Sequence, residues 1–168
     1  NGGACSTGCL IDGVYYADGA TNPTNPCQQC SATRSTTAWS NTADGTSCGS
    51  GAICNAGACS TGCRIDGVYY ANGDGNPTNP CQQCSSMTST SGWSNKANGT
   101  SCGAAQICNA GSCGSGCLIG GTYYASGAAN PANPCQQCTP GTSTTAWSNK
   151  TDGTACGAAQ ICRAGACS

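Results

Sequence analysis

The chain has 168 residues, 19 of them cysteine and 26 glycine, with no histidine and a net charge of −1 from only 7% charged residues. So little charge excludes a basic surface for nucleic acid or anionic lipid. The sequence also has no run of 18 apolar residues, so membrane insertion is not expected. Cysteine this abundant is typical of disulfide scaffolds in oxidising compartments, so we expect a secreted, extracellular or cell-surface protein.

The first predicted element is a hairpin over residues 10–16, because Asp12-Gly13 separates two short apolar runs, as a two-residue primed turn requires. A second turn is predicted at Asp18-Gly19. In residues 22–30, Pro23 and Pro26 each remove a backbone donor, so we expect a stiff, non-helical connector there.

A polar segment, residues 31–40, then leads to Trp39, which we place on a short strand, and residues 44–59 predict two or three further turns between close cysteines. Helix has little support anywhere. The apolar residues can cover only a small cluster: Ile11, Val14, Tyr15, Tyr16, Trp39 and Ile53. Burial this small does not offset chain entropy, so disulfides at about 2–4 kcal/mol each must supply the stability.

The cysteine pattern repeats every 54 residues, and 39 of 54 positions are identical between residues 5–58 and 59–112. We therefore predict three modules, residues 5–58, 59–112 and 113–166, with 167–168 beginning a further repeat. The predicted fold is a linear tandem array of small disulfide-rich modules, mostly irregular with short β-hairpins and little or no helix. We interpret the segment as a window from a longer array.

The nineteen cysteines are candidates for disulfide bonds: Cys5, Cys9, Cys27, Cys30, Cys48, Cys54, Cys59, Cys63, Cys81, Cys84, Cys102, Cys108, Cys113, Cys117, Cys135, Cys138, Cys156, Cys162 and Cys167. Six cysteines per module allow fifteen connectivities, and spacing does not select one. The cysteines can be grouped in sixes in two ways. If the first group runs from Cys9 to Cys59, Cys5 has no partner in the segment, and if it runs from Cys5 to Cys54, Cys167 has none. The cysteine left over either bonds to a neighbouring unit or stays free.

The sequence CLIDGVYYADG followed by NPCQQC resembles the opening subdomain of von Willebrand factor type C and chordin-like modules, over about 22 of the 54 residues. The later Cys-x-Cys and Cys-Cys features of that family are absent, so its full fold and growth-factor binding are not carried over. The segment DGTSCGSGAICNAGAC resembles Asp-Gly-Thr-x-Cys-Gly segments of metalloproteinase cysteine-rich regions and surface repeat proteins. These resemblances imply an extracellular location and a repeat architecture.

Catalysis is not expected, because the chain has neither histidine nor glutamate and its six aspartates form no recurring pair. Asp44 becomes Asn98 in the second repeat, which suits a turn residue better than a catalyst. The cysteines Cys27, Cys30, Cys48 and Cys54 have spacing that zinc would accept, but two further cysteines per unit favour disulfides. We predict no metal and no cofactor.

Candidate attachment sites for glycans are of two kinds. Asn98 and Asn149 lie in Asn-x-Thr sequons. Clusters of hydroxyl residues before each tryptophan are candidates for O-linked sugars: Ser35, Thr36, Thr37, Ser89, Thr90, Ser91, Ser143, Thr144 and Thr145. The alternative for these clusters is a plain hydrophilic loop.

Three tyrosine pairs are candidate contact residues: Tyr15, Tyr16, Tyr69, Tyr70, Tyr123 and Tyr124. Alternation along a strand places one tyrosine of each pair in the core and the other on the surface, where it could bind a ligand or the next module.

We predict a structural repeat protein of an extracellular fibre, stalk or matrix, stabilised by disulfides and decorated with covalent glycans. Its expected partner is itself, as neighbouring repeats or head-to-tail copies. The alternative is a multivalent module that binds a glycan or a growth factor, in which repetition supplies avidity.

Overall fold

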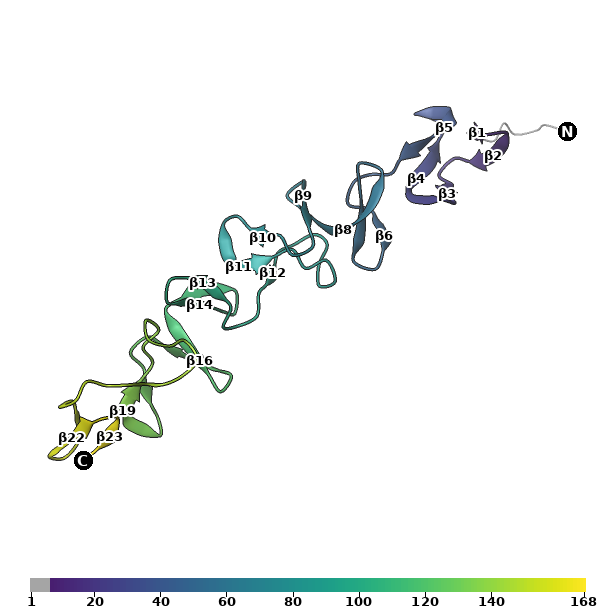
Figure 1. The fold of residues 1–168 in the computed structure, drawn as a ribbon. Helices are drawn as coiled ribbons and strands as arrows, with labels where there is room; N and C mark the ends of the chain where they lie inside the picture. The colour runs from purple at the N-terminus through teal and green to yellow at the C-terminus, as the bar shows by residue number, and fades with distance from the viewer. Residues whose placement is uncertain (1–6) are drawn as a thin grey trace. The chain divides into compact units, whose positions relative to one another are not determined.

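A computed structural model describes residues 7–168 of the chain, and this part contains only short strands and turns, with no helix (Figure 1). Every strand pair whose register is resolved is antiparallel, and the sheets have two to four strands. The prediction of a small disulfide-rich fold with short β-hairpins is confirmed.

The first repeat contains β1 to β7, which are Gly8–Ile11, Val14–Ala17, Thr21–Asn22, Asn25–Ser31, Ser35–Asn41, Ser47–Gly49 and Ala52–Asn55. Strands β8 to β15 follow, and the first and last of them cross the boundaries of the second repeat: Ala58–Ile65, Val68–Ala71, Gly75–Asn76, Asn79–Gln83, Ser94–Asn95, Ser101–Gly103, Gln106–Asn109 and Ser112–Gly114. The third contains β16 to β23, which are Gly116–Ile119, Thr122–Ala125, Ala129–Asn130, Asn133–Gln137, Ser148–Asn149, Ala155–Gly157, Gln160–Arg163 and Ala166–Cys167.

The described chain forms two compact units, and the division passes through the second repeat. The first unit contains the described residues up to Asp74 together with Gln83–Ser94, and the second contains Gly75–Gln82 and Asn95–Ser168. Each unit therefore contains the second half of one repeat together with the hairpin that begins the next repeat.

The hairpin predicted at Asp12-Gly13 is present, because β1 pairs with β2 and Ile11 stands opposite Val14. Asp12 has φ 50° and Gly13 has φ 79°, which are the left-handed conformations that a type I′ turn requires at both central positions. The third repeat places Gly120 and Gly121 in the same turn. The predicted turn at Asp18-Gly19 is also present, closed by the N–H of Ala20 donating to the carbonyl of Ala17.

The expectation of a stiff connector over residues 22–30 is wrong, because this segment is a second hairpin. Strands β3 and β4 pair with Asn22 opposite Asn25, so that Pro23 and Thr24 form the turn. The side chain of Asn22 closes this turn by accepting hydrogen bonds from the Thr24 N–H and hydroxyl, both 2.9 Å. The missed signal was Asn22, whose amide supplies the turn closure that the prolines leave open.

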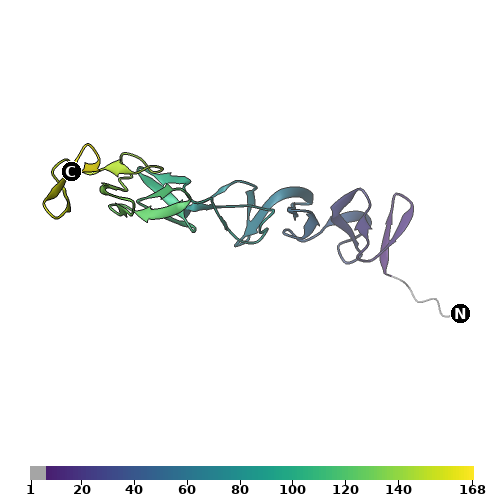
Figure 2. The same ribbon diagram turned by 90° about the horizontal axis from the view of Figure 1, so that it is seen from below.

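The second half of each repeat forms a three-stranded meander. In the first repeat β6, β7 and β8 pair in this order, through the turns at Ser50-Gly51 and Ala56-Gly57. Strand β8 continues and pairs with β9, which makes a four-stranded sheet that spans residues of two repeats. Figure 1 shows β8 leading from β6 toward β9, and Figure 2 shows the same ribbon from below.

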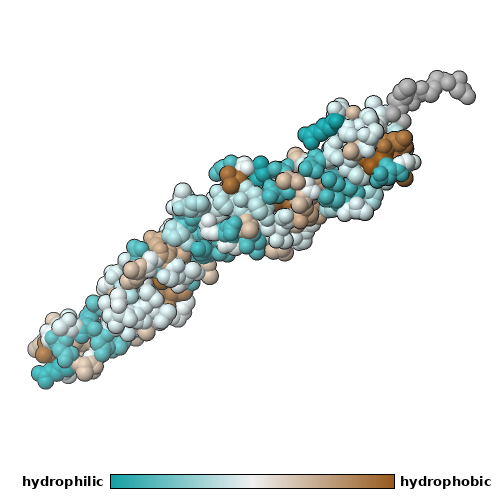
Figure 3. Space-filling view, turned by 45° about the horizontal axis from the view of Figure 1, so that its top comes forward, coloured by the Kyte–Doolittle hydropathy of each residue, from teal (hydrophilic) through white to brown (hydrophobic). Residues whose placement is uncertain are grey.

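The core is small in each repeat, as predicted. In the first repeat the half-buried rings of Tyr16 and Trp39 pack against the buried cluster of Cys9, Ile11 and Cys30. Val14 is 51% exposed at the hairpin tip, so it does not contribute to this cluster. Apolar surface is therefore scattered in small patches among hydrophilic residues (Figure 3).

Candidate functional site

Nine disulfides join eighteen cysteines in three equivalent groups. In the first group the bonds are Cys9–Cys30, Cys27–Cys54 and Cys48–Cys59. The second group is Cys63–Cys84, Cys81–Cys108 and Cys102–Cys113, and the third is Cys117–Cys138, Cys135–Cys162 and Cys156–Cys167. Of the two phases left open by the sequence, the structure has the one that starts at Cys9, and Cys5 lies outside the described residues.

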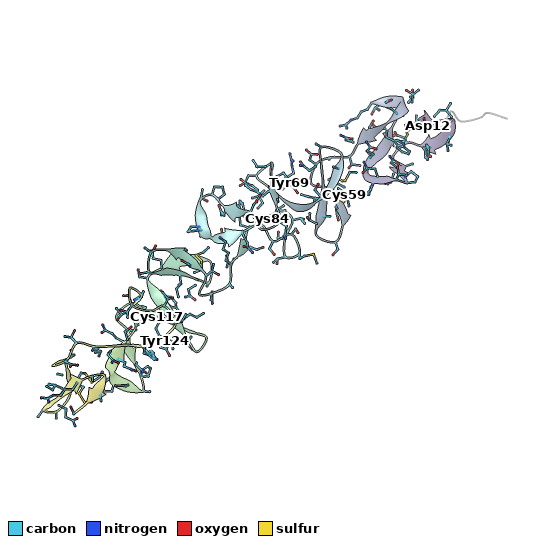
Figure 4. The ribbon with its side chains drawn as sticks, in the orientation of Figure 1. Asp12, Cys59, Tyr69, Cys84, Cys117 and Tyr124 are labelled. Carbon is cyan, nitrogen blue, oxygen red and sulfur yellow. A yellow bond between two sulfur atoms is a disulfide. The ribbon has the colours of Figure 1, made fainter. Side chains whose placement is uncertain are left out.

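The third bridge of each group crosses the boundary between sequence repeats. Cys48 belongs to residues 5–58, whereas Cys59, labelled on β8 in Figure 4, is the first residue of the next repeat. We therefore call residues 9–62, 63–116 and 117–168 the disulfide modules, since each of these segments holds one whole group of bridges.

The first two bridges of a module interlock along the chain. Cys27 lies inside the loop closed by Cys9–Cys30, and Cys30 lies inside the loop closed by Cys27–Cys54. The covalent route runs from Cys9 across to Cys30, back three residues to Cys27, across to Cys54 and on nine residues to Cys63. When a module is pulled between Cys9 and Cys63, the shortest covalent path therefore comprises twelve residue steps and two bridges, whereas the unlinked chain would have 54 residue steps.

The second and third bridges lie beside each other. The sulfur atoms of Cys27, Cys48 and Cys59 are all within 4.8 Å of one another, and the same two bridges in the other modules supply the groups Cys81, Cys102 and Cys108, and Cys135, Cys156 and Cys162. The four cysteines with zinc-like spacing are distributed over three disulfides, because Cys30 bonds to Cys9. Sulfur in a disulfide is not the thiolate that ligates zinc.

The bridges differ in exposure. The sulfur-bearing residues of Cys9–Cys30 and Cys27–Cys54 have no exposed surface, whereas Cys48 is half-buried and Cys59 is exposed. A reductant in solution therefore reaches the boundary-crossing bridge first.

The first module junction joins the turn at Asp44-Gly45 to Arg64 of the next module. The guanidinium of Arg64 lies 3.3 Å from an Asp44 carboxylate oxygen, and the stem of Arg64 covers Gly45 so closely that a Cβ there would lie 3.2 Å from Cδ. Beside it, a Cβ on Gly51 would lie 2.7 Å from the sulfur of Met87. The junction is thus formed by glycine turns on one side and long side chains on the other.

The second junction has the same geometry with different residues. Leu118 takes the position of Arg64 and covers Gly99, where a Cβ would lie 2.8 Å from the leucine Cδ2. The positions of Gly51 and Met87 hold Ala105 and Gly141 here, and a Cβ on Gly141 would meet nothing within 4 Å, so this second contact is not repeated. The residues of these junctions were not predicted from the sequence.

A network of amide side chains joins the two halves of each module. Asn22 donates to Gln28, and Gln28 donates to Asn41, at 2.9 and 3.4 Å. The side chain of Asn41 lies against Gly57, whose carbonyl accepts a hydrogen bond from Asn25 at 2.9 Å. The same bonds recur in the other two modules, so the recurrence of NPCQQC reflects this network.

The aspartates close turns. Asp44 accepts a hydrogen bond from the N–H of Ala56 at 2.8 Å, and Asp152 accepts one from Ala164 at 2.8 Å. Asn98 does the same for Ala110 at 2.7 Å, which explains how an amide can replace the carboxylate in the second repeat. Charge is therefore not needed at this position.

The two tyrosines of each pair have different surroundings. Tyr16 packs on Trp39 with ring centroids 4.6 Å apart, and Tyr124, labelled in Figure 4, packs on Trp147 at 4.5 Å. Tyr15 is 52% exposed, and its hydroxyl donates to the carbonyl of Thr7 at 3.2 Å. Its ring lies over Gly8, where a side chain would collide with it.

The two sequon asparagines are both exposed, but their side chains have different neighbours. Asn98 uses its carbonyl oxygen for the turn bond to Ala110, so the amide nitrogen that would carry a glycan makes no resolved bond among the described residues. Asn149 accepts from Gln136 at 3.2 Å, and its amide nitrogen lies beside Gly165. Asn98 is therefore the more accessible candidate.

The hydroxyl clusters before each tryptophan contain both structural and exposed residues. The hydroxyl oxygen of Ser35 accepts bonds from the N–H groups of Thr37 and Ala38, and Ser89 and Ser143 accept corresponding bonds. Thr90 and Thr144 are half-buried and their carbonyls accept bonds from Arg64 and Leu118. The exposed members are Thr36, Thr37, Ser91 and Thr145.

In comparisons with protein-family models, with curated protein sequences and with solved structures, no match to this chain was found. Residues 7–168 enclose no pocket. This part of the chain also lacks any helix with the length and apolarity that a membrane span requires. The junctions and their disulfides are thus the recurring geometric feature on which a functional proposal can be built.

Proposed function

We propose that this chain is a structural repeat protein of an extracellular fibre, stalk or matrix. The interlocked bridges Cys9–Cys30 and Cys27–Cys54, repeated in each module, are the observation that supports this proposal. Together the two bridges leave only twelve of the 54 residue steps of a module free to extend, so their mechanical consequence is resistance to extension.

The expected mechanical effect follows from chain geometry. At about 3.5 Å per residue, 54 unlinked residues extend to about 190 Å, whereas twelve residue steps and two bridges extend to about 50 Å. A load that unfolds a module completely thus gains little length while the bridges are intact. Disulfides at this density also support secretion into an oxidising compartment.

Single-molecule force spectroscopy of the oxidised and reduced chain tests this proposal. We expect each module to gain about 140 Å of extensible length on reduction. Loss of Cys27–Cys54 through the double alanine variant lengthens the first module by about 35 Å, because the route then follows residues 30–48 and crosses Cys48–Cys59. Loss of Cys48–Cys59 leaves the length unchanged, since the shortest route does not use this bridge.

Electron microscopy of native material is the second test of the proposal. Regular polymers that contain the chain are expected. Isolated monomers in the native source, or an oxidised chain that extends as far as the reduced one, would contradict the structural role.

A second candidate is multivalent recognition of a glycan or growth factor, favoured by the exposed ring of Tyr15 and by the likeness of the first half of each repeat to von Willebrand type C modules. Alanine substitution of Tyr15, Tyr69 and Tyr123 should abolish binding on a glycan or growth-factor array. Phenylalanine at these positions retains the ring and serves as the control. Equal binding by the alanine variant rejects this candidate.

Covalent glycans are part of the structural proposal, with Asn98 as the first candidate site. Intact mass spectrometry of native protein tests it, because a glycan adds mass to the oxidised chain. A mass equal to that of the bare chain with nine disulfides would exclude decoration.

A further inference from the structure

We infer that Cys59 is a site of attack by a small external thiol, such as glutathione, and that the opened bridge then exchanges partners with the bridge Cys27–Cys54. The products are the bridges Cys27–Cys48 and Cys54–Cys59. Such reactivity goes beyond the proposed structural role and does not depend on it. It is supported by the exposure of one cysteine, the proximity of two bridges and the register of one strand pair.

Cys59 is the point of entry, because it is the one exposed residue among the described cysteines. In the second module the equivalent Cys113 is half-buried, and the side-chain oxygen of Gln106 lies 3.7 Å from its sulfur. The first module has Ala52 at the position of Gln106, so no long side chain from this position shields Cys59. Access limits the rate at which a thiol attacks a disulfide, so the first module should react before the second.

Cys48 is the residue freed by this attack, and its neighbour is the second bridge. An external thiolate that bonds to the sulfur of Cys59 breaks the Cys48–Cys59 bond and leaves Cys48 as a thiolate. The sulfur atoms of Cys48 and Cys27 lie within 4.8 Å of each other, and the equivalent pairs in the other two modules are equally close. The thiolate of Cys48 can therefore attack Cys27, form the bond Cys27–Cys48 and displace Cys54 as a thiolate.

Cys54 and Cys59 stand opposite each other on β7 and β8, which places the last two sulfur atoms together. The N–H and carbonyl of Cys54 bond to Thr46 and Gly45, on the side of β7 away from β8, so Cys54 and Cys59 form a non-hydrogen-bonded pair. The Cα atoms of such pairs are about 4.5 Å apart, which is within the range of about 4.4–6.8 Å that disulfides accept. The thiolate of Cys54 can therefore attack Cys59, form the second new bridge and release the external thiolate.

The exchange consumes no oxidant and no reductant. Two disulfides break and two form, and the proton that the external thiol loses when it attacks returns when it leaves. The shortest covalent path through the module becomes only one residue step and one bridge longer, because the steps from Cys48 to Cys54 and from Cys59 to Cys63 replace those from Cys54 to Cys63. The module thus changes partners without losing its resistance to extension.

A water-soluble phosphine tests the point of entry in the oxidised chain. The Cys5→Ser background leaves only the eighteen cysteines of the nine bridges. At about pH 4 the phosphine reduces accessible bridges while the scarcity of thiolate suppresses exchange. We expect a maleimide to label Cys48 and Cys59 at least about threefold faster than Cys102 and Cys113, as located by peptide mass spectrometry.

Two reciprocal variants show whether the side chain at this one position controls access. Ala52→Gln should slow the labelling of Cys59 to the rate of Cys113, and Gln106→Ala should raise the rate at Cys113 to that of Cys59. Equal rates at the two bridges in the parent chain, or rates that respond to neither variant, overturn Cys59 as the point of entry.

The variant Cys59→Ala tests the exchange itself, because it leaves Cys48 as a free thiol beside the bridge Cys27–Cys54. At about pH 8 without oxygen we expect the free thiol to be shared between Cys48 and Cys54, since loops that differ by six residues have nearly the same closure entropy. Maleimide labelling followed by full reduction and peptide mass spectrometry measures the two fractions. Label confined to Cys48, or fractions that depend on protein concentration, overturns exchange within the module.

The variant Cys30→Ala is the matched control, because it also frees one buried-bridge partner. The freed Cys9 belongs to none of the sulfur groups within 4.8 Å that residues 7–168 contain, so its label should stay on Cys9. Label spread over many cysteines in both variants overturns the inference, because unfolding and random pairing would then explain the sharing in Cys59→Ala.

The double variant Cys27→Ala/Cys48→Ala tests the last step, since it leaves Cys54 and Cys59 as the only thiols. In a buffer of reduced and oxidised glutathione we expect these two residues to form a bridge, seen as loss of two hydrogens and of maleimide labelling. The bridge should form at least about threefold faster in the folded chain than in guanidinium, where the pairing of β7 with β8 is lost. Equal rates in the two solvents, or stable glutathione adducts in place of the bridge, overturn the assigned pairing.

Discussion

In the first half of each module one disulfide packs against aromatic and aliphatic side chains, whereas the second half is held by two disulfides that lie against each other, one of which ties it to the first half. The first half has Ile11, Tyr16 and Trp39 around Cys9–Cys30. The second half has Ile53 as its buried branched residue, and its two bridges bring three sulfur atoms within 4.8 Å. The first half therefore depends on packing and a bridge together, and the second depends more on sulfur.

Loss of the buried bridge between the two halves is the largest effect that we predict. The bridge Cys27–Cys54 spans 27 residues and is fully buried, whereas Cys48–Cys59 spans 11 and is partly exposed. The longer loop alone adds about 0.8 kcal/mol of closure entropy. We expect Cys27→Ala/Cys54→Ala to cost about 4–5 kcal/mol and Cys48→Ala/Cys59→Ala about 2–3 kcal/mol.

Hydrogen exchange of the Gly45 amide, which donates to the carbonyl of residue 54, measures these losses. The amide of residue 54 itself is unsuitable, because the substitution changes this residue. The corresponding amides of Gly99 and Gly153 in the same molecule are internal controls. Equal costs for the two double variants would contradict the ranking by loop length and burial.

Removal of the tryptophan ring tests the first half in the same way. Trp39→Ala deletes the contact with Tyr16, and because the ring is half-buried we expect a loss of about 2–3 kcal/mol, below the range for fully buried aromatics. Exchange of the Cys30 amide, which donates to Ala20, should accelerate while that of Gly45 stays unchanged. Acceleration of both amides to the same degree would show that the halves unfold as one unit.

Local turn chemistry is what the sequence predicted well in both halves. Asp12-Gly13 defines a primed turn by itself, since both residues tolerate the left-handed conformation and need no distant partner. Asn22 was missed because its effect depends on a side-chain bond to Thr24 rather than on backbone preference. The sequence alone therefore identified turns whose cause lies in adjacent residues.

Pairing and junction contacts could not be predicted, for a different reason. Six cysteines at these spacings satisfy many closures, and only the three-dimensional course of the chain brings Cys48 beside Cys59. The junction contact of Leu118 with Gly99 joins residues of consecutive repeats and has no local signature.

A glycine in the meander gives the next smaller effect. Gly57 has φ 83° and lies against the side chain of Asn41, so Gly57→Ala introduces both backbone strain and a collision. We expect a loss of about 1–2 kcal/mol from the left-handed conformation alone. The neighbour Ala56, at φ 50°, shows that the fold tolerates such strain where no side chain collides.

The double variant Asn41→Ala/Gly57→Ala separates the two causes, with denaturant unfolding of the oxidised chain as the measurement. Removal of the Asn41 amide relieves the collision but not the strain, so partial recovery over Gly57→Ala alone is expected. Full recovery would assign the entire loss to the collision.

The smallest predicted effect concerns the charged contact at the first junction. Arg64 and Asp44 are 3.3 Å apart, with side chains 31% and 35% exposed, so solvent screens the pair and its contribution is about 0–1 kcal/mol. Arg64→Leu replaces the arginine with the residue present at the equivalent position of the second junction, where leucine covers the glycine turn without an ion pair. We expect exchange of the Gly45 amide to change by less than about threefold, because packing on Gly45 is retained.

Arg64→Asp opposes Asp44 with a like charge and lacks the long stem, so it should accelerate exchange of the Gly45 amide more than Arg64→Leu does. The difference between the two variants should diminish at 1 M salt. A large, salt-sensitive loss with leucine would instead show that charge pairing, rather than contact with the glycine turn, holds the first junction together.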